Sequence, residues 1–295
     1  MRLVTFRFQD RVRIGVQLVR SGEPYIFGLD QVQADLPAGL LPLLTAGASA
    51  LDRAREALAS ARQDQLIPAG EAVLLAPLPR PGKILCLGHN YQGHIGLGRT
   101  EPPEFPTIFS KPATAVIGPG QPIIIPRVTE QVDFEAELAV VIGRGGRCIP
   151  EAEAMDHVAG YTIANDVSAR DYQKRTSQWM IGKAFDSFCP LGPALVTADE
   201  VPDPYTLELV LTLNGVERQR ANTADLIFSI AFLISYLSAV MSLEPGDLIL
   251  TGTPAKLPSG PETPAFMRAG DIVEITIDRL GTLRNPVVAE DITDV

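Results

Sequence analysis

The sequence predicts an α+β protein whose β-rich core is preceded by a small N-terminal α/β domain. Short apolar runs of strand length recur along the 295 residues, whereas convincing helical periodicity occurs in only a few places. The 25 glycines and 25 prolines favour turns and short strands over long helices. A chain of this length fits one large domain with a small appendage.

Residues 1–75 are expected to form the small N-terminal domain, and residues 76–295 the larger domain. The boundary is placed just before a proline-rich joint at 77–82, which breaks regular structure. The elements expected in the small domain are strands at 3–6 and 13–19 and a helix at 51–62.

Strand-like apolar runs dominate the larger domain, and two helices interrupt them. An Asn214-Gly215 pair follows one of these runs and predicts a tight hairpin turn, because both residues tolerate positive φ. The strands are expected at 83–87, 122–125, 138–142, 160–164, 207–213, 247–251 and 271–277.

The segment 226–243 contains no charged residue and is long enough to resemble a membrane span. Its serines recur at three- and four-residue spacing, which places hydroxyls on one helical face and apolar side chains on the other. A buried core helix ended by Pro245-Gly246 is therefore favoured over a membrane span. The apolar face is expected to contain Ile230, Leu233, Leu237 and Val240.

The formal net charge of -10 and the pI near 4.9 argue against nucleic-acid and membrane partners, which attract Lys and Arg. The three cysteines, Cys86, Cys148 and Cys189, are odd in number and widely spaced, so neither a disulfide framework nor a thiolate zinc site is predicted. The first ten residues lack the apolar run of a signal peptide. We therefore expect a reducing, cytoplasmic location.

Two carboxylates stand two residues apart on an apolar strand, at Glu135 and Glu137. Strand periodicity places both on the same face, where they repel each other and are costly to bury without a cation or a shared proton. Alone, this pattern would favour an exposed edge strand with a solvated acidic face. A third acid, Asp166, ends another apolar strand. Three oxygen ligands without His or Cys suit Mg²⁺ or Mn²⁺ and disfavour zinc.

Six motifs stand out along the larger domain. They are Gly88-His-Asn-Tyr-Gln-Gly-His94, Phe109-Ser-Lys-Pro112, Asp133-Phe-Glu-Ala-Glu137, Asn165-Asp-Val-Ser-Ala-Arg-Asp-Tyr-Gln173, Gly182-Lys-Ala-Phe-Asp186 and Leu250-Thr-Gly-Thr-Pro254. Together they resemble the fumarylacetoacetate hydrolase family over most of residues 82–290. Over 158–197 the resemblance is strongest to the members called fumarylacetoacetate hydrolase domain-containing protein 2. The resemblance implies a catalytic domain of the family's β-sandwich roll type and a homodimer.

Carried over to this chain, the resemblance implies a metal site and a substrate site. The implied metal ligands are Glu135, Glu137 and Asp166, binding Mg²⁺ or Mn²⁺. The implied substrate contacts are Gln173, Lys183 and Thr253, with Gly252 in the same turn, and His94 is implied as an acid/base on a lid.

The substrate implied is a small 2-oxo acid, which chelates a divalent cation through its carboxylate and oxo oxygens. The cation then stabilises the enolate that forms when a proton shifts, CO₂ is lost or a carbon-carbon bond beta to a carbonyl is cleaved. Lys183 would add positive charge beside the developing oxyanion. A surface ion pair with Asp186 is the alternative for this lysine.

His94 is of the right type for proton transfer near neutral pH. Lyase and hydrolase members of the family usually carry Glu three residues after this histidine, whereas this chain has Leu97. Hydrolysis therefore lacks its water-activating dyad, unless Glu101 or Glu104 replaces the missing acid. Decarboxylation or keto-enol tautomerisation of an oxaloacetate-like acid is favoured.

Two alternatives stay within the family, namely hydrolysis of an acylpyruvate or fumarylacetoacetate-type substrate and isomerisation of 2-hydroxyhepta-2,4-diene-1,7-dioate. A third is a non-catalytic protein that binds a metal and an oxo acid. A metal-dependent nuclease is disfavoured by the acidic net charge and by the lack of a basic groove signature.

Overall fold

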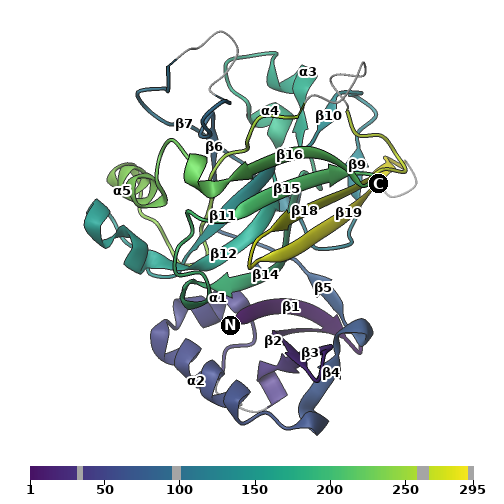
Figure 1. Cartoon of the computed structure of the whole chain (residues 1–295), viewed down its shortest axis with the longest axis vertical. Coiled ribbons are helices and arrows are strands. Elements are labelled where there is room, and N and C mark those ends of the chain that lie inside the picture. Colours follow the sequence, from purple (N-terminus) through teal and green to yellow (C-terminus); the bar gives the residue numbers. More distant parts are fainter. Residues whose placement is uncertain (32–35, 95–100, 258–265, 292–295) are drawn as a thin grey trace.

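The computed structural model describes residues 1–31, 36–94, 101–257 and 266–291. A small lobe at one end of the molecule carries the N-terminus, and a larger β-rich body carries the rest of the chain (Figure 1).

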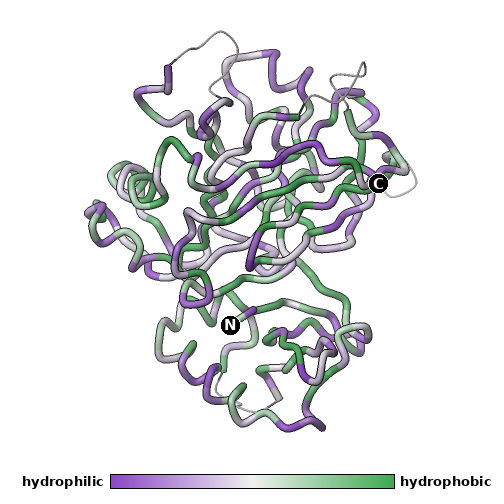
Figure 2. Tube along the Cα trace, in the orientation of Figure 1, coloured by the Kyte–Doolittle hydropathy of each residue, from purple (hydrophilic) through white to green (hydrophobic). Residues whose placement is uncertain are grey.

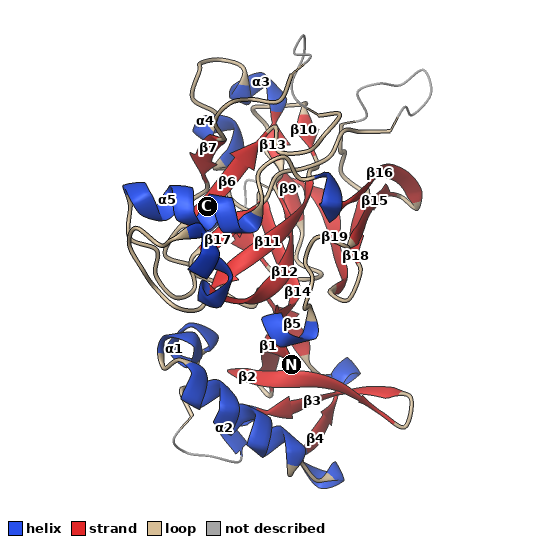
Figure 3. Ribbon diagram, turned by 60° about the vertical axis from the view of Figure 1, so that its left-hand side comes forward, coloured by secondary structure: helices blue, strands red, loops and turns tan. Residues whose placement is uncertain are grey.

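Two helices cover one side of a small sheet in the N-terminal lobe (Figure 3). The helix expected at 51–62 lies three residues earlier, because Gly47 with a φ of 78° precedes its first turn and Ser60 ends it. The elements of the lobe are β1 (Arg2–Phe8), β2 (Arg11–Arg20), β3 (Glu23–Gly28), α1 (Leu40–Thr45), α2 (Ala48–Ala59), β4 (Leu66–Pro68) and β5 (Val73–Leu75).

The lobe and the body share one sheet and one core. Strand β1 pairs antiparallel with β14 (Cys189–Thr197) of the body. Leu3 and Phe27 of the lobe belong to the same buried cluster as Val141 and Leu248 of the body. The division into two domains at residue 75 therefore stays a prediction.

The large sheet runs in the order β4-β3-β2-β1-β14-β12-β11-β17-β6-β7, with β5 beside β1 and β8 beside β14. Its parallel pair of β17 and β6 stands next to β11, at the centre of the body. The further strands of this sheet are β6 (Ile84–Gly88), β7 (Thr107–Ser110), β8 (Val116–Ile117), β11 (Ala136–Ile142), β12 (Val158–Asn165) and β17 (Leu248–Leu250).

A second sheet of five strands runs in the order β16-β15-β18-β19-β9, and a short ribbon pairs β10 with β13. The turn between β15 and β16 has positive φ at both Asn214 and Gly215, which confirms the predicted hairpin. The predicted β-rich α+β fold is confirmed. These strands are β9 (Ile123–Ile125), β10 (Val132–Asp133), β13 (Ser168–Ala169), β15 (Glu208–Leu213), β16 (Val216–Asn222), β18 (Ile272–Ile277) and β19 (Gly281–Ala289).

Strand β11 separates two hydrophobic cores. Leu138 and Val140 face a core shared with the five-stranded sheet, whereas Ala139 and Val141 face the core shared with the N-terminal lobe. This alternation follows from the two-residue period of a strand. The central strands are accordingly apolar along most of their length (Figure 2). Side chains at odd positions, including Glu137, point to the side of the N-terminal lobe.

Helix α5 (Ile230–Val240) forms within the uncharged segment. Ser229 caps its first turn by accepting the N–H of Phe232. The expected apolar face is wrong at its last position, because Val240 is 69% exposed while Ser238 is buried. The hydroxyl of Ser238 is satisfied there, since it accepts the N–H of Ile149. No helix among the described residues is long and apolar enough to cross a membrane.

Two short helices, α3 (Arg170–Gln173) and α4 (Met180–Lys183), gather at the end of the body remote from the lobe (Figure 3). They were not expected from the sequence, because four residues are too few to show helical periodicity. Both lie in segments that the sequence marks as motifs.

The buried Gln219 of β16 links the second sheet to the start of β11. Its Oε1 accepts the N–H of Ala136 at 3.0 Å, and its Nε2 donates to Thr253 Oγ1 at 2.8 Å and to the carbonyl of Pro254 at 2.7 Å. One amide thus fixes β11 relative to the turn that follows β17.

Replacing Gln219 with Leu should lower the free energy of unfolding by about 2–4 kcal/mol, because the N–H of Ala136 and the carbonyl of Pro254 would lose a buried partner. Urea unfolding followed by circular dichroism measures this change. Arg220→Ala is the control with little expected effect, because Arg220 forms exposed ion pairs on the same strand. A Gln219→Leu protein as stable as the wild type would contradict the linking role.

Candidate active site

Three carboxylates converge where β11 begins and β12 ends. Glu137 lies in β11, Glu135 lies between β10 and β11, and Asp166 directly follows β12. The register that pairs Ala136 with Asn165 places Asp166 opposite Glu135, and the N–H of Asp166 donates to the carbonyl of Glu135 at 2.9 Å. One oxygen of each carboxylate lies within 4.8 Å of the others. The structure therefore brings together the three residues predicted as metal ligands.

Glu135 lies just outside the strand that was expected to carry both glutamates. The side chain of Asn165 accepts the N–H of Glu135 at 3.0 Å, and Gln219 accepts the N–H of Ala136. These two amides take backbone donors that a neighbouring strand would otherwise use, so the strand begins only at Ala136. Glu135 and Glu137 nevertheless reach the same cluster.

Two buried lysines neutralise part of this acidic cluster. Lys183 Nζ lies 2.7 Å from Glu135 Oε2 and 2.5 Å from Asp166 Oδ2, and Lys111 Nζ lies 2.7 Å from Asp166 Oδ1. Burial alone would lower the pKa of Lys183, but the negative charges of Asp166 and Glu135 raise it. The ammonium therefore stays charged. The alternative, a surface ion pair of Lys183 with Asp186, is wrong.

Glu137 has no basic partner in the part of the chain that the structure describes. Its Oε2 accepts the N–H of Gly252 at 2.7 Å. Burial and the negative charges of Asp166 and Glu135 raise the pKa of Glu137 well above its usual range. A divalent cation would relieve this repulsion, and an all-oxygen donor set suits Mg²⁺ or Mn²⁺. The residues present therefore fit a hard cation.

Arg170 connects the cluster of three acids to a fourth acid, Asp133. Its Nε lies 2.7 Å from Asp133 Oδ2, its Nη2 lies 2.5 Å from Glu135 Oε1, and its Nη1 donates to Gln173 Oε1 at 3.0 Å. Burial opposes ionisation of Glu135, but the charges of Arg170 and Lys183 lower its pKa below the usual range. The ammonium of Lys256 forms a further ion pair with Asp133.

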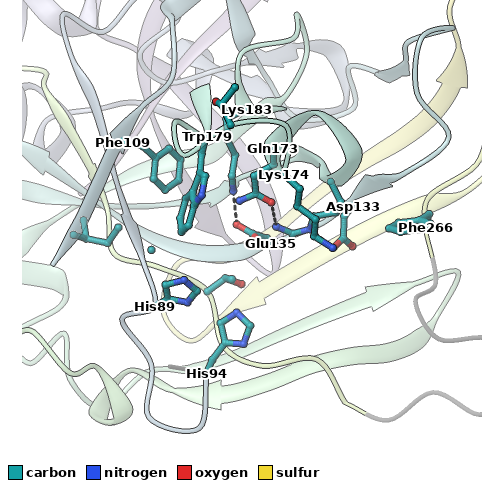
Figure 4. Close-up of a pocket in the computed structure, with 15 residues that line it drawn as sticks. His89, His94, Phe109, Asp133, Glu135, Gln173, Lys174, Trp179, Lys183 and Phe266 are labelled. Atoms are coloured by element: carbon teal, nitrogen blue, oxygen red, sulfur yellow. Dashed lines mark hydrogen bonds and ion pairs between the residues drawn. The ribbon is translucent and has the colours of Figure 1, made fainter. Parts of the chain in front are cut away.

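Glu135 and Lys183 of the cluster line a cavity of about 480 Å³, with Glu137 and Asp166 buried behind them (Figure 4). Trp179 forms one aromatic wall, with its ring centroid 5.4 Å from those of His89 and Phe109. In Figure 4, polar and charged side chains lie on the other side of Glu135 and Lys183. Those lining side chains are Asp133, Arg170, Gln173 and Lys174. The cavity therefore has an aromatic wall and a charged wall.

His94 lines the same cavity, as expected for an acid/base. Burial lowers the pKa of His94 below its ordinary value of 6.5, so the neutral imidazole predominates at pH 7. Leu97 lies outside the described residues. Glu101 and Glu104 are exposed, and neither forms a hydrogen bond with His94 in the described structure.

The turn after β17 contributes Gly252 and Thr253. Thr253 lines the cavity, whereas the N–H of Gly252 is taken by Glu137. Gly252 adopts a φ of 97°, and an added Cβ would lie 2.9 Å from Cβ of Asn90, so only glycine fits. The substrate-binding roles of Gly252, Thr253 and Gln173 stay predictions.

Reasoning from the sequence assigned no role to four charged residues of this site. Lys111, Arg170 and Asp133 all fall inside the motifs that carry the family resemblance. Their charge beside clustered acids was the signal that would have found them. Lys256 lies two residues beyond a motif, and only the folded chain shows its ion pair with Asp133.

The two buried cysteines do not take part as thiolates. Cys86 and Cys189 are buried, Cys148 is exposed, and all three are unpaired. Burial raises the pKa of Cys189 to about 12 and that of Cys86 well above its ordinary value. The two buried side chains are therefore neutral thiols near the acidic cluster.

A β-rich fold with a buried acidic triad at the foot of a cavity defines a class of metal-dependent enzymes. Residues 83–288 match the family model described as fumarylacetoacetate (FAA) hydrolase C-terminal. The chain belongs to the fumarylacetoacetate hydrolase family and, like the relatives below, it is an enzyme.

Named relatives cover nearly the whole chain. It is 44% identical over 292 residues to "Oxaloacetate tautomerase fahd2, mitochondrial" of Xenopus laevis, covering 98% of this chain and 90% of that protein. It is 42% identical over 290 residues to "Oxaloacetate tautomerase FAHD2A, mitochondrial" of Homo sapiens, covering 98% and 92%.

Solved structures of similar fold support the same family. A maleylpyruvate hydrolase from Sphingobium sp. SYK-6, in complex with manganese (II) ion and pyruvate, has a TM-score of 0.81 at 32% identity, covering 99% of this chain and 100% of that one. A fumarylacetoacetate hydrolase from Exiguobacterium antarcticum has a TM-score of 0.83 at 32% identity, covering 98% and 100%.

Asp166→Asn should weaken Mn²⁺ binding at least about 100-fold, because one anionic ligand is lost and the amide is a poorer donor. Isothermal titration calorimetry measures the dissociation constant. Asp186→Asn is the matched control, since Asp186 is exposed outside the cluster. Unchanged Mn²⁺ affinity in Asp166→Asn would exclude this residue as a ligand.

Proposed function

We propose that this enzyme uses Mg²⁺ or Mn²⁺, held by Glu135, Glu137 and Asp166, to tautomerise or decarboxylate an oxaloacetate-like acid. The observation that carries the proposal is the burial of three carboxylates within 4.8 Å of one another beside a charged Lys183, at the foot of a cavity. The printed names of the relatives, oxaloacetate tautomerases, support the same substrate class.

The charges of the site favour a dianionic substrate. Among the described residues, the cluster contains four carboxylates, of Asp133, Glu135, Glu137 and Asp166, and four basic side chains, of Lys111, Arg170, Lys183 and Lys256. With Glu137 ionised, as a metal ligand would be, the protein charges thus balance. A divalent cation brings two positive charges, which the dianion of a 2-oxo dicarboxylic acid would neutralise.

The bound ion would supply positive charge beside the oxo and carboxylate oxygens of the substrate, which favours enolate formation. Lys183 keeps its ammonium beside the same oxygens, and its raised pKa suits electrostatic stabilisation rather than attack as a free amine. His94, neutral at pH 7, accepts a proton from the carbon next to the oxo group while the oxo oxygen gains a proton to give the enol. In the reverse direction the protonated His94 donates to that carbon and the enol oxygen loses its proton.

Tautomerisation and decarboxylation are favoured over hydrolysis because they need no activated water. Glu101 and Glu104, the acids considered as replacements for a lid glutamate, are exposed and do not contact His94 in the described structure. Hydrolysis is the second candidate, since a neighbour of similar fold is named a maleylpyruvate hydrolase. Isomerisation of 2-hydroxyhepta-2,4-diene-1,7-dioate stays a further alternative, because another neighbour is named for that activity.

A substrate panel with and without Mg²⁺ should separate these reactions. We expect loss of the oxaloacetate enol absorbance to accelerate with Mg²⁺, and acylpyruvate hydrolysis to be slower in kcat/KM. Rapid acylpyruvate hydrolysis with inert oxaloacetate would refute the preference. A protein that binds oxalate with Mg²⁺ yet turns over no oxo acid would favour the non-catalytic alternative.

His94→Gln should lower kcat about 10²- to 10⁴-fold, because it removes the proton acceptor without removing a metal ligand. In the wild type, kcat/KM should fall on the acid side with a midpoint below pH 6.5, since burial lowers the pKa of His94 and only the neutral ring accepts a proton. A pH-rate profile measures both effects, and Mn²⁺ affinity is the control. An acid limb that persists unchanged in His94→Gln would contradict this role.

The homodimer implied by the family resemblance and the cytoplasmic location are also proposals. Three unpaired cysteines, of which Cys148 is exposed, support a reducing compartment. Exposed apolar side chains near the site, Phe105, Met180 and Ile181, support contact with a second chain.

A further inference from the structure

Next to Asp133, on the charged wall of the cavity, stands a basic group to which the proposed reaction gives no task. Lys256 follows the turn that carries Thr253, and its backbone is held in place by a bridge to Gln219. Its Nζ pairs with Asp133 and lies 4.4 Å from the ring centroid of Phe134, and its side chain is 25% exposed. The ammonium is therefore positioned, and only partly covered, beside an acid that lines the cavity.

Lys256 is held by fewer partners than Arg170. The three guanidinium nitrogens of Arg170 are fixed by Asp133, Glu135 and Gln173. A lysine ammonium carries three donors, and the described hydrogen-bond partner of Lys256 is Asp133 alone. Of the two cations on Asp133, Lys256 is therefore the one that can reorient toward a ligand, with two donors left.

We propose that Lys256 is a specificity-determining residue, which binds the carboxylate at the end of the substrate remote from the metal. This inference rests on the proposed function and assigns the residue that selects the second carboxylate of the proposed 2-oxo dicarboxylic acid. Asp133 acts as a positioning residue, because it holds the Lys256 ammonium next to Arg170.

The local charge at this wall calls for an anion. Asp133 is shared by Arg170 and Lys256, and Glu135 is shared by Arg170 and Lys183. Each of these two carboxylates thus pairs with two cations, so the series of ion pairs ends in the positive charge of Lys256. A partly desolvated ammonium forms strong charge-assisted hydrogen bonds with a carboxylate. Phe109 and Trp179 line the opposite wall, so the charged groups concentrate on one side of the cavity, where Phe266 lies beyond Asp133 (Figure 4).

The position of His94 relates the two ends of the substrate. Glu135 and Lys256 both lie close enough to His94 to influence its pKa. A short dicarboxylic acid that spans the acidic triad and Lys256 would lie in the cavity that His94 lines. The carbon that gains or loses a proton lies between those two ends.

Oxaloacetate and its 4-methyl ester provide matched substrates, because they share the 2-oxo acid end and differ in charge at the far end. Both enolise, so loss of enol absorbance in the presence of Mg²⁺ measures tautomerisation of each. The wild type should prefer oxaloacetate in kcat/KM by about tenfold or more, the factor expected for a charge-assisted hydrogen bond to the ligand. Equal kcat/KM for the two compounds would overturn the inference.

Lys256→Met should abolish this preference, mainly by raising KM for oxaloacetate, and Lys256→Arg should retain part of it. Arg220→Met, which removes one positive charge from an exposed position, is the control that should keep the full preference. Inhibition by oxalate should be similar in all these proteins, because oxalate occupies only the metal end. If Lys256→Met fails to fold, the wild-type ester comparison and Lys256→Arg decide.

The outcomes separate the inference from the proposed function. A wild type that turns over no oxo acid defeats the proposed function. If the wild type is active but Lys256→Met slows the turnover of oxaloacetate and of its ester by the same factor, only the inference fails. The same holds when Lys174→Met, at the cavity rim, removes the preference and Lys256→Met does not.

Discussion

The mutual repulsion of three buried carboxylates is the constraint on which this site depends. Such a group is stable in a protein interior only when positive charge lies against it. Lys183 and Lys111 supply that charge to Asp166, and Lys183 with Arg170 supplies it to Glu135. Among the described residues, Glu137 accepts only a backbone N–H. Burial and the repulsion from Asp166 and Glu135 raise its pKa, and a divalent cation would remove that repulsion.

The fold creates this cluster through breaks in regular structure rather than through regular structure itself. The strand ladder carries Glu137 and sets the register that brings Asp166 to Glu135. Two side-chain amides, of Asn165 and Gln219, then take the backbone donors on either side of Glu135 and end the ladder. Gln219 also holds the turn that carries Thr253, so the acidic cluster and this part of the cavity wall share one support.

The strands were predictable because they follow from strong local rules, whereas the acidic triad was predicted only with the family resemblance, since the paired glutamates alone would favour an exposed edge strand. Strand periodicity predicted that Glu135 and Glu137 share a face, and the Asn-Gly pair at 214 and 215 predicted the hairpin. Elements of four residues, such as α3 and α4, carry no periodic signal. Partners distant in sequence were also hidden: the ion pair of Lys256 with Asp133 spans 123 positions, and no local pattern reports it. Val240 was misplaced because the serine face of α5 is satisfied by hydrogen bonds inside the core.

The cavity combines an acidic foot that fits a divalent cation with one aromatic and one charged wall, and we propose that it takes a short acid that is charged at both ends. Anomalous diffraction from a crystal soaked in excess Mn²⁺ tests the central claim most directly. The expected result is one strong anomalous peak among the carboxylates of Glu135, Glu137 and Asp166. A map with no peak there, or with its Mn²⁺ peak on other residues, would contradict the metal site and the chemistry built on it.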